Sequence, residues 1–256
     1  MTVSFYAVCA QMAVGGFASL LFAPPRQIGR GFYRLAAAVY AAAVGTLIWL
    51  GPQTPFGAFS AAGTIFSALV FLGAVLSWTR LAALTPILAW ASIPAGAFFL
   101  IALASRVHAA LSPDLPDLNA QALAVRFGLS AGLVGFSMTA MLFGHWYLTT
   151  PEMPTRYLMR LQRCLLAAWA GTAAWILYSL WGRWEYASLA DPRGVFMLAR
   201  ILFGAAAVGA CAWLAWFFLR EDSTQSATGF LYLAFVFAVM GEFTAYYLTL
   251  RAGLPI

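Results

Sequence analysis

The sequence is short of charge. Only 9% of its 256 residues are charged, whereas 63% are hydrophobic. A soluble domain carries charge on about a quarter of its residues. This shortage excludes an ordinary water-soluble domain and makes lipid the expected solvent. The net charge of +6 then reports membrane topology, and we expect no nucleic-acid partner.

Cysteine and histidine are too few for the common cofactor sites. Cys9, Cys164 and Cys211 have no paired spacing, which indicates packing residues and gives no support for disulfides or iron–sulfur ligands. His145 lies near one end of an apolar segment, and His108 falls in a loop predicted at the opposite side. Haem b usually takes histidines from facing helices, so His145 is a weak candidate haem ligand and a two-haem site lacks ligands.

Motifs for self-contained catalysis are also missing. The sequence has no phosphate-binding glycine-rich loop, no His/Cys metal spacing and no convincing nucleophile–base pair. We therefore do not expect the chain to be catalytic alone. Any electron-carrying cluster is expected in another subunit.

Long apolar runs dominate what is present. Each is near the roughly 20 residues that a helix needs to cross a bilayer, and none shows the alternation of a β-barrel strand. The sequence predicts an all-α, polytopic membrane protein with eight transmembrane helices. Their approximate ranges are 4–23, 32–50, 58–78, 82–104, 121–148, 161–181, 194–219 and 227–249.

Arginine sets the predicted topology. Alternating the loops between the two sides gathers one large group on one side: Arg26, Arg30, Arg34, Arg80, Arg156, Arg160, Arg163 and Arg220. The other side holds Arg106, Arg183, Arg193 and Arg251. By the positive-inside rule the larger group is cytoplasmic, so both termini of this multi-pass protein of the inner (cytoplasmic) membrane are predicted outside the cytoplasm.

An internal repeat divides the chain. Eight residues recur at identical spacing: Arg30, Arg34, Leu35, Ala41, Ala42, Gly45, Thr46 and Trp49 return as Arg156, Arg160, Leu161, Ala167, Ala168, Gly171, Thr172 and Trp175. Later, Gly96, Phe98, Leu103 and Arg106 match Gly241, Phe243, Leu248 and Arg251. We interpret residues 1–118 and 119–256 as two copies of one four-helix unit.

The copies are expected to be parallel tandem bundles, because four helices, an even number, separate equivalent positions. Each bundle should pack through small residues that allow close helix approach. The candidates are Gly45/Thr46, Gly171/Thr172, Gly132/Gly135 and Gly204/Gly209.

Four polar residues inside the predicted spans are the candidate site: Gln11, Arg126, Arg200 and Glu242. A charge at bilayer depth costs at least about 2.5 kcal/mol on insertion scales, so each needs a reason. Predicted topology places all four roughly 10 Å beneath the outer interface. Glu242 corresponds to Ala97 in the first copy, and Arg200 approximately to Thr64, so the charges occur in one copy only.

Two interpretations of this polar set stay open. In one, Arg200 and Glu242 form a salt bridge that locks two helices while Arg126 extends outward to the interface. In the other, the residues form a site in which Glu242 accepts protons from a quinol and an Arg or Gln donates to a quinone carbonyl. Trp184, Tyr246 and Tyr247 could then line a ring slot, or belong to an interfacial aromatic belt.

In architecture the chain resembles the polysulfide-reductase-type (NrfD-type) membrane anchors of respiratory complexes. The resemblance covers the eight spans, and no residue role is carried over from it. It implies two four-helix bundles, a quinone site beside one of them, and other subunits of a membrane complex as partners. Two alternatives are a transporter or channel subunit gated by Arg200 and Glu242, and a structural or assembly subunit without its own ligand.

Overall fold

The computed structural model describes residues 2–23, 28–55, 60–111, 113, 118–150, 153–181 and 191–256, and these are helical nearly throughout. Arg26, Arg183 and Trp184 lie outside the described residues. The α-helices are α1 (Thr2–Ser19), α3 (Arg30–Leu50), α4 (Ala61–Ser77), α5 (Thr85–Leu111), α6 (Ala120–Thr149), α7 (Arg156–Leu180), α8 (Pro192–Ala199), α9 (Val208–Arg220) and α10 (Thr224–Ala252). A π-helical segment, η5 (Arg200–Ala207), joins α8 to α9.

Seven helical stretches in the described residues are long and apolar enough to cross a membrane, with α8, η5 and α9 counting as one stretch of 29 residues. The all-α class predicted from the sequence is thereby confirmed, and the helices have the length and composition of a multi-pass membrane protein. The eighth stretch, α4, has 17 residues and is shorter than the range predicted for it.

Two helices extend beyond the ranges predicted for them. Helix α5 continues to Leu111, so the prediction of a loop from residue 105 is wrong and His108 lies in its last turn. Helix α7 begins at Arg156, five residues before the predicted span. Hydropathy marks where a helix is apolar, whereas the helix itself continues into the interface until a turn residue or proline ends it.

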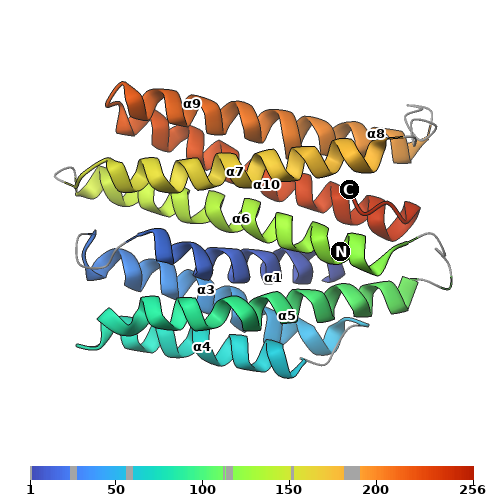
Figure 1. Cartoon of the computed structure of the whole chain (residues 1–256), viewed down its shortest axis with the longest axis horizontal. Helices are drawn as coiled ribbons and strands as arrows, with labels where there is room; N and C mark the ends of the chain where they lie inside the picture. The colour runs from blue at the N-terminus through green and yellow to red at the C-terminus, as the bar shows by residue number, and fades with distance from the viewer. Residues whose placement is uncertain are drawn as a thin grey trace.

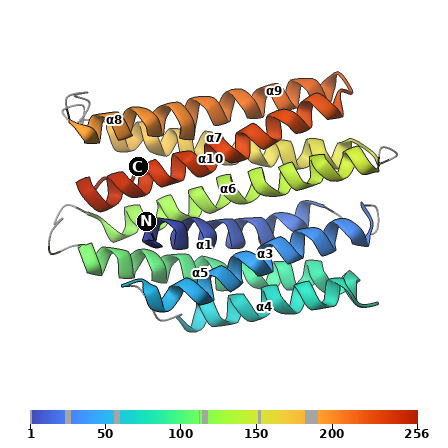
Figure 2. The same ribbon diagram turned by 180° about the vertical axis from the view of Figure 1, so that it is seen from behind.

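The helices run along one long axis, with α1 and α6 side by side in the middle (Figures 1 and 2). On one side α1 packs on α3 and α5, and α4 packs on both of those. On the other side α6 packs on α7 and α10, and α9 packs on both of those. Helices α3 and α7 begin at Arg30 and Arg156, which are equivalent positions of the repeat.

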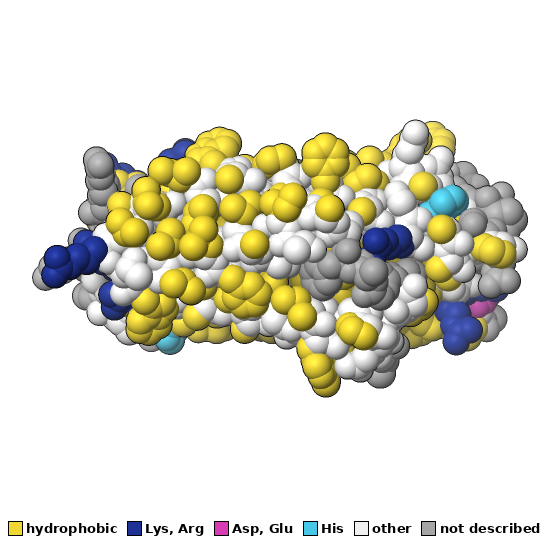
Figure 3. Space-filling model, turned by 90° about the horizontal axis from the view of Figure 1, so that it is seen from below, with side chains coloured by type: hydrophobic (Ala, Val, Ile, Leu, Met, Phe, Trp, Pro, Cys, Tyr) yellow, Lys and Arg dark blue, Asp and Glu magenta, His cyan; other side chains and the backbone are white. Residues whose placement is uncertain are grey.

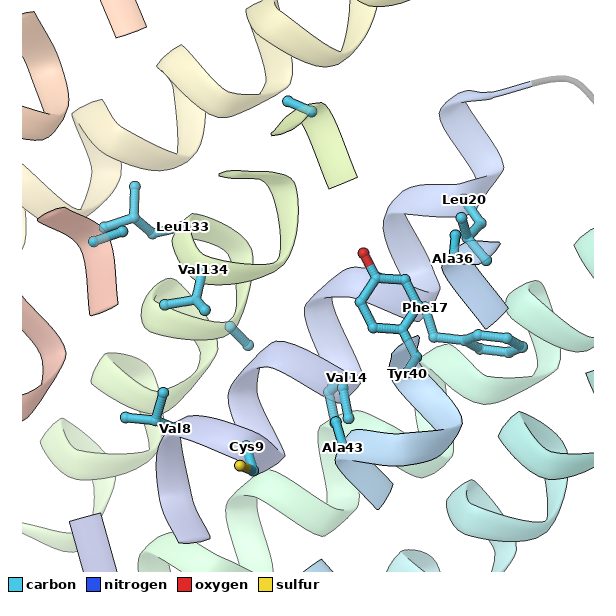
Figure 4. Close-up of a cluster of buried hydrophobic side chains, with 14 of the residues drawn as sticks. Val8, Cys9, Val14, Phe17, Leu20, Ala36, Tyr40, Ala43, Leu133 and Val134 are labelled. Atoms are coloured by element: carbon cyan, nitrogen blue, oxygen red, sulfur yellow. The ribbon is translucent and has the colours of Figure 1, made fainter. Parts of the chain in front are cut away.

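Helix α1 belongs to the most buried of the seven long apolar stretches in the described residues. Figure 4 shows Val14 and Phe17 of α1 on the side of Tyr40 of α3, with Leu133 and Val134 of α6 on the other side of α1, and all five are buried. Apolar burial does not drive association between helices in lipid, so close packing must supply the contact energy.

Glycines bring α1 and α6 together. A Cβ added to Gly135 would lie 2.2 Å from the backbone of Gly15, so no larger residue fits that crossing. Gly209 accommodates the ring of Trp169 in the same way, at 2.4 Å. The prediction of a close approach at Gly45 is wrong, because nothing lies within 4 Å of a Cβ there.

The outer surface is apolar over its middle. On the face in Figure 3, many hydrophobic side chains are spread over the central part, and most of the dark-blue side chains lie toward the ends. The exposed large residues include Trp49, Trp90, Ile101, Leu177 and Trp213. A contiguous exposed apolar band of this kind suits contact with lipid tails.

Candidate functional site

Three charged side chains meet inside the helices. Glu242 of α10 accepts from Arg126 of α6 at 3.1 Å through Oε2 and from Arg200 of η5 at 3.0 Å through Oε1. The side chains are 0 to 1% exposed, so lipid and water are excluded from all three. We call Arg126, Arg200 and Glu242 the ion cluster.

The structure shows the direction in which Arg126 points. The predicted Arg200–Glu242 salt bridge is present, but the outward extension of Arg126 is wrong. Its Nη1 donates to Thr249 Oγ1 at 3.2 Å, and its guanidinium lies 4.2 Å from the ring centroid of Tyr246. Arg126 turns inward because a buried carboxylate, a hydroxyl and an aromatic face together replace the water it leaves.

Gln11 reaches the cluster indirectly. Its Nε2 donates to the hydroxyl of Tyr246 at 2.7 Å, and Tyr246 in turn supports Arg126. The structure therefore brings all four predicted residues together from α1, α6, η5 and α10. Their role as a quinone or proton-transfer site stays a prediction.

Helix geometry explains how α10 supplies three groups. Glu242, Tyr246 and Thr249 are spaced i, i+4 and i+7, which places them on one face. The sequence pattern gave no role to Thr249, because threonine in an apolar helix usually bonds its own backbone. Thr249 does that here, to the carbonyl of Ala245 at 2.9 Å, while it also accepts from Arg126.

The backbone around Arg200 is unusual. Arg200 is the first residue of η5, and π-helical turns are frequent at functional sites. Within this segment the carbonyl of Ala205 accepts both from the backbone N–H of Val208 and from the indole Nε1 of Trp169, the latter at 2.7 Å. No sequence signal predicted this segment, because a π turn depends on the contacts around it rather than on local propensity.

The depth of the cluster follows from the helix ends. Arg126 lies six residues from the start of α6, and Glu242 lies ten residues from the end of α10. At 1.5 Å per residue these separations correspond to about 9 and 15 Å. The cluster thus lies toward the end of the molecule where α1 starts and α10 stops (Figure 1), and its depth beneath a membrane interface stays a prediction.

The charges in the cluster do not balance. Two guanidinium groups share one carboxylate, which leaves a formal charge of +1 in a fully buried place. Arg126 Nε, Arg200 Nε and Arg200 Nη2 are buried without hydrogen-bond partners among the described residues. These unpartnered N–H groups and the excess positive charge leave the cluster able to donate hydrogen bonds to an acceptor or an anion.

A cavity of about 370 Å³ lies one helical turn from Arg126, toward the start of α6. Ala122, which precedes Arg126 by four residues on the same face of α6, is part of its wall. The full lining is Asn119, Ala122, Trp175, Tyr178, Ser179, Trp181 and Pro255. The indole of Trp175 donates to the carbonyl of Pro255 at 2.7 Å and closes the wall beside the buried residues Leu254 and Ile256.

The other candidate residues are dispersed. His145 is exposed, and its Nδ1 lies 3.1 Å from the hydroxyl of Tyr232. Tyr247 stacks on Phe196 with ring centroids 3.7 Å apart, outside the ion cluster. Among the described residues, no three His, Cys, Asp or Glu side chains come together to hold a metal ion.

The first half offers no equivalent interior position. Ala97 and Thr64, which correspond to Glu242 and approximately to Arg200, are both exposed on the outside of the helices. A charge at either place would face lipid, which explains why the cluster occurs in the second half alone.

Comparisons with protein families, curated proteins and solved structures find no match to this chain.

Proposed function

We propose that all eight helical stretches cross the cytoplasmic membrane as two parallel four-helix halves, 1–118 and 119–256, with both termini outside the cytoplasm. The equivalent helix contacts in the two halves support the repeat, as do the matched starts of α3 and α7. The arginine-rich ends of α3 and α7 support the orientation.

We propose further that the second half binds a quinone or quinol at the ion cluster. This proposal rests on the guanidinium N–H groups of Arg126 and Arg200 that have no hydrogen-bond partner within the described residues. They belong to a buried cluster whose formal charge is +1. A quinone carbonyl is a neutral acceptor that can take such donors in an apolar site, and a reduced ring carrying negative charge would be held more strongly. The ring contact belongs to Arg200, because two of its nitrogens, Nε and Nη2, have no hydrogen-bond partner in the described part of the chain, against one nitrogen of Arg126.

The ring reaches the cluster through the cavity beside Ala122. The cavity has aromatic walls and a volume within the range of small-molecule sites. Pro255 and Leu254 lie between it and Thr249, whose hydroxyl lies 3.1 Å from the carbonyl of Leu254. Binding displaces these C-terminal residues, and the hydrogen bond between Trp175 and Pro255 is broken.

The protein acts as a membrane subunit of an electron-transfer complex. Oxidation of a quinol releases two electrons and two protons; the protons pass to the water at that end of the protein, and the electrons need an acceptor. The sequence carries no spacing for metal clusters, so the acceptor belongs to a partner subunit.

The test is binding of a short-chain quinone to the purified protein in detergent. Quenching of tryptophan fluorescence measures the binding. We expect saturable binding that weakens at least about tenfold in Arg200→Gln, from the loss of charged hydrogen bonds. Arg193→Gln, on an exposed arginine at the same end, is the matched control and should bind normally. Ala122→Phe fills the cavity without touching an ion and should also abolish binding, even if Arg200→Gln does not fold.

A structural role without a ligand is the second candidate. It is favoured by the complete burial of the cluster and by the ties it makes between α6, η5 and α10. Failure of the unmodified protein to bind any quinone, together with lower stability of the Glu242 variants, supports this role. Ion flux through the purified protein in liposomes that disappears in Glu242→Gln supports the transporter alternative instead.

A further inference from the structure

A second cavity lies at the opposite end of the helices from the ion cluster. It measures about 280 Å³ and lies where the end of α1 meets α5, α6 and α7. Its lining is Ala18, Leu21, Phe22, Trp90, Ile93, Phe136 and Arg160. Six of these seven residues are apolar, and Arg160 is the single charged one.

The residues that line the cavity are spread along the length of the helices. Arg160 lies four residues into α7, near the arginine-rich end, whereas Phe136 lies thirteen residues from the end of α6. At 1.5 Å per residue the two differ in depth by roughly 14 Å. Trp90 and Ile93 form the opposite wall and are exposed on the lipid-facing surface. The groove is therefore long, apolar and open toward lipid, with a cation at one end.

Positive charge is concentrated at that end. Arg156, Arg160 and Arg163 are spaced i, i+4 and i+7 on the first turns of α7, and all three are exposed. They form a stripe on one face of the helix. The guanidinium of Arg160 lies 5.3 Å from the ring centroid of Phe22, which holds it over the groove.

Comparison with the repeat identifies Arg160 as different from its counterpart. Arg34, at the equivalent position in α3, donates through Nε to the carbonyl of Ser77 at 3.2 Å and stacks on Trp78 at 5.1 Å. Arg34 is thus used to join α3 to the end of α4. In the described part of the chain Arg160 has the contact with Phe22 and no hydrogen-bond partner, so its donors are available to an anion.

We propose that this groove binds one anionic phospholipid. The headgroup phosphate is held by Arg160 with the neighbouring charges of the α7 stripe, and one acyl chain lies between Phe22, Ile93 and Phe136. A phosphodiester supplies the acceptor oxygens that arginine pairs with, and the chain supplies the apolar surface that the groove lacks on its open side. Because the groove touches α5 of one half and α7 of the other, the bound lipid joins the two halves.

The test uses native mass spectrometry of the full-length protein, stripped of lipid in detergent and then given phosphatidylglycerol or phosphatidylcholine with the same acyl chains. We expect one tightly retained phosphatidylglycerol per chain and no comparable retention of phosphatidylcholine. Arg160→Ala should weaken the retained binding about fivefold, the usual effect of one basic residue on an anionic lipid. Ala18→Phe should abolish it by filling the groove while the charge is kept.

The matched control is Arg220→Ala, which removes an exposed arginine from the same end of the molecule but outside the groove. It should leave the tight binding intact. Equal loss in Arg160→Ala and Arg220→Ala would mean diffuse attraction to the arginine-rich end, and the proposal would be wrong. Unchanged binding in Ala18→Phe, or equal retention of the two lipids, would overturn it as well.

Discussion

Gly241 of α10 faces Gly204 of η5 so closely that a Cβ added to Gly241 would lie 2.5 Å from the Cα of Gly204 and 3.1 Å from Nη1 of Arg200. The same nitrogen of Arg200 bonds Glu242, the next residue of α10. The close approach of the two glycines therefore sets the length of the ion pair. Small residues at a helix crossing usually serve packing alone, and here they also position a charge.

Gly241→Ala should consequently separate the two helices and weaken the Arg200–Glu242 contact. We expect a loss of about 1–3 kcal/mol in stability from overpacking, measured by thermal or denaturant unfolding in detergent. Gly229→Ala is the matched control on the same helix, because nothing lies within 4 Å of a Cβ there. Equal effects of the two substitutions would contradict the packing role of Gly241.

Glu242→Gln should be far more damaging than loss of an exposed acid. It leaves two buried guanidinium groups without a counter-charge, and removal of one partner from a buried pair costs about 3–5 kcal/mol. Asp191 pairs with Arg193 at 4.0 Å with both side chains 46% exposed, so Asp191→Asn should change stability by about 0–1 kcal/mol. A stable, well-folded Glu242→Gln protein would show that the cluster does not hold the helices.

Trp169→Phe tests the support of the π-helical segment. The substitution keeps an aromatic ring against Gly209 but leaves the carbonyl of Ala205 without its indole donor, at a cost of about 1 kcal/mol. Trp213→Phe is the control, since Trp213 is exposed and stacks on Phe217. Unfolding measurements that rank the control as the more destabilised protein would rule out this role for Trp169.

The crossing of α4 can be tested directly. Gln53 and Thr79 are exposed residues that flank this 17-residue helix. Single cysteines at the two positions, in a protein whose native cysteines are replaced by serine, should react with a membrane-impermeant maleimide from opposite sides. Thr79 should be cytoplasmic. Labelling of both positions from one side would show that α4 does not cross the membrane. The two halves would then not be parallel.

The contrast between Glu242 and Thr249 shows what the sequence could and could not predict. A carboxylate in an apolar run has a high cost and stands out, so the members of the ion cluster could be chosen without coordinates. Thr249 is ordinary in a membrane helix, and only its hydrogen bond with Arg126 marks it. Tyr246 was a candidate for its aromatic ring, but its contact with Arg126 was not predictable. The π turn at Arg200 has no local signature for the same reason.

The positions of the helices were predictable from composition. Their ends and their closest contacts depend on geometry and were less predictable. Apolar runs located the helices, but the end of α5 at Leu111 depends on how far the helix extends beyond the apolar region. Gly135 and Gly45 look alike in the sequence, and their surroundings differ because one lies at the α1–α6 crossing and the other does not.

The hydrogen bond between Gln11 and Tyr246 has a consequence for biogenesis. The two residues are 235 positions apart, so Gln11 enters the bilayer long before its partner has been synthesised. Membrane helices insert before they associate, and an amide in hydrocarbon attracts any available partner in the meantime. The earliest helix of the nascent chain thus acquires its final neighbours last, and truncated chains lacking α10 should expose this amide to quality-control proteases.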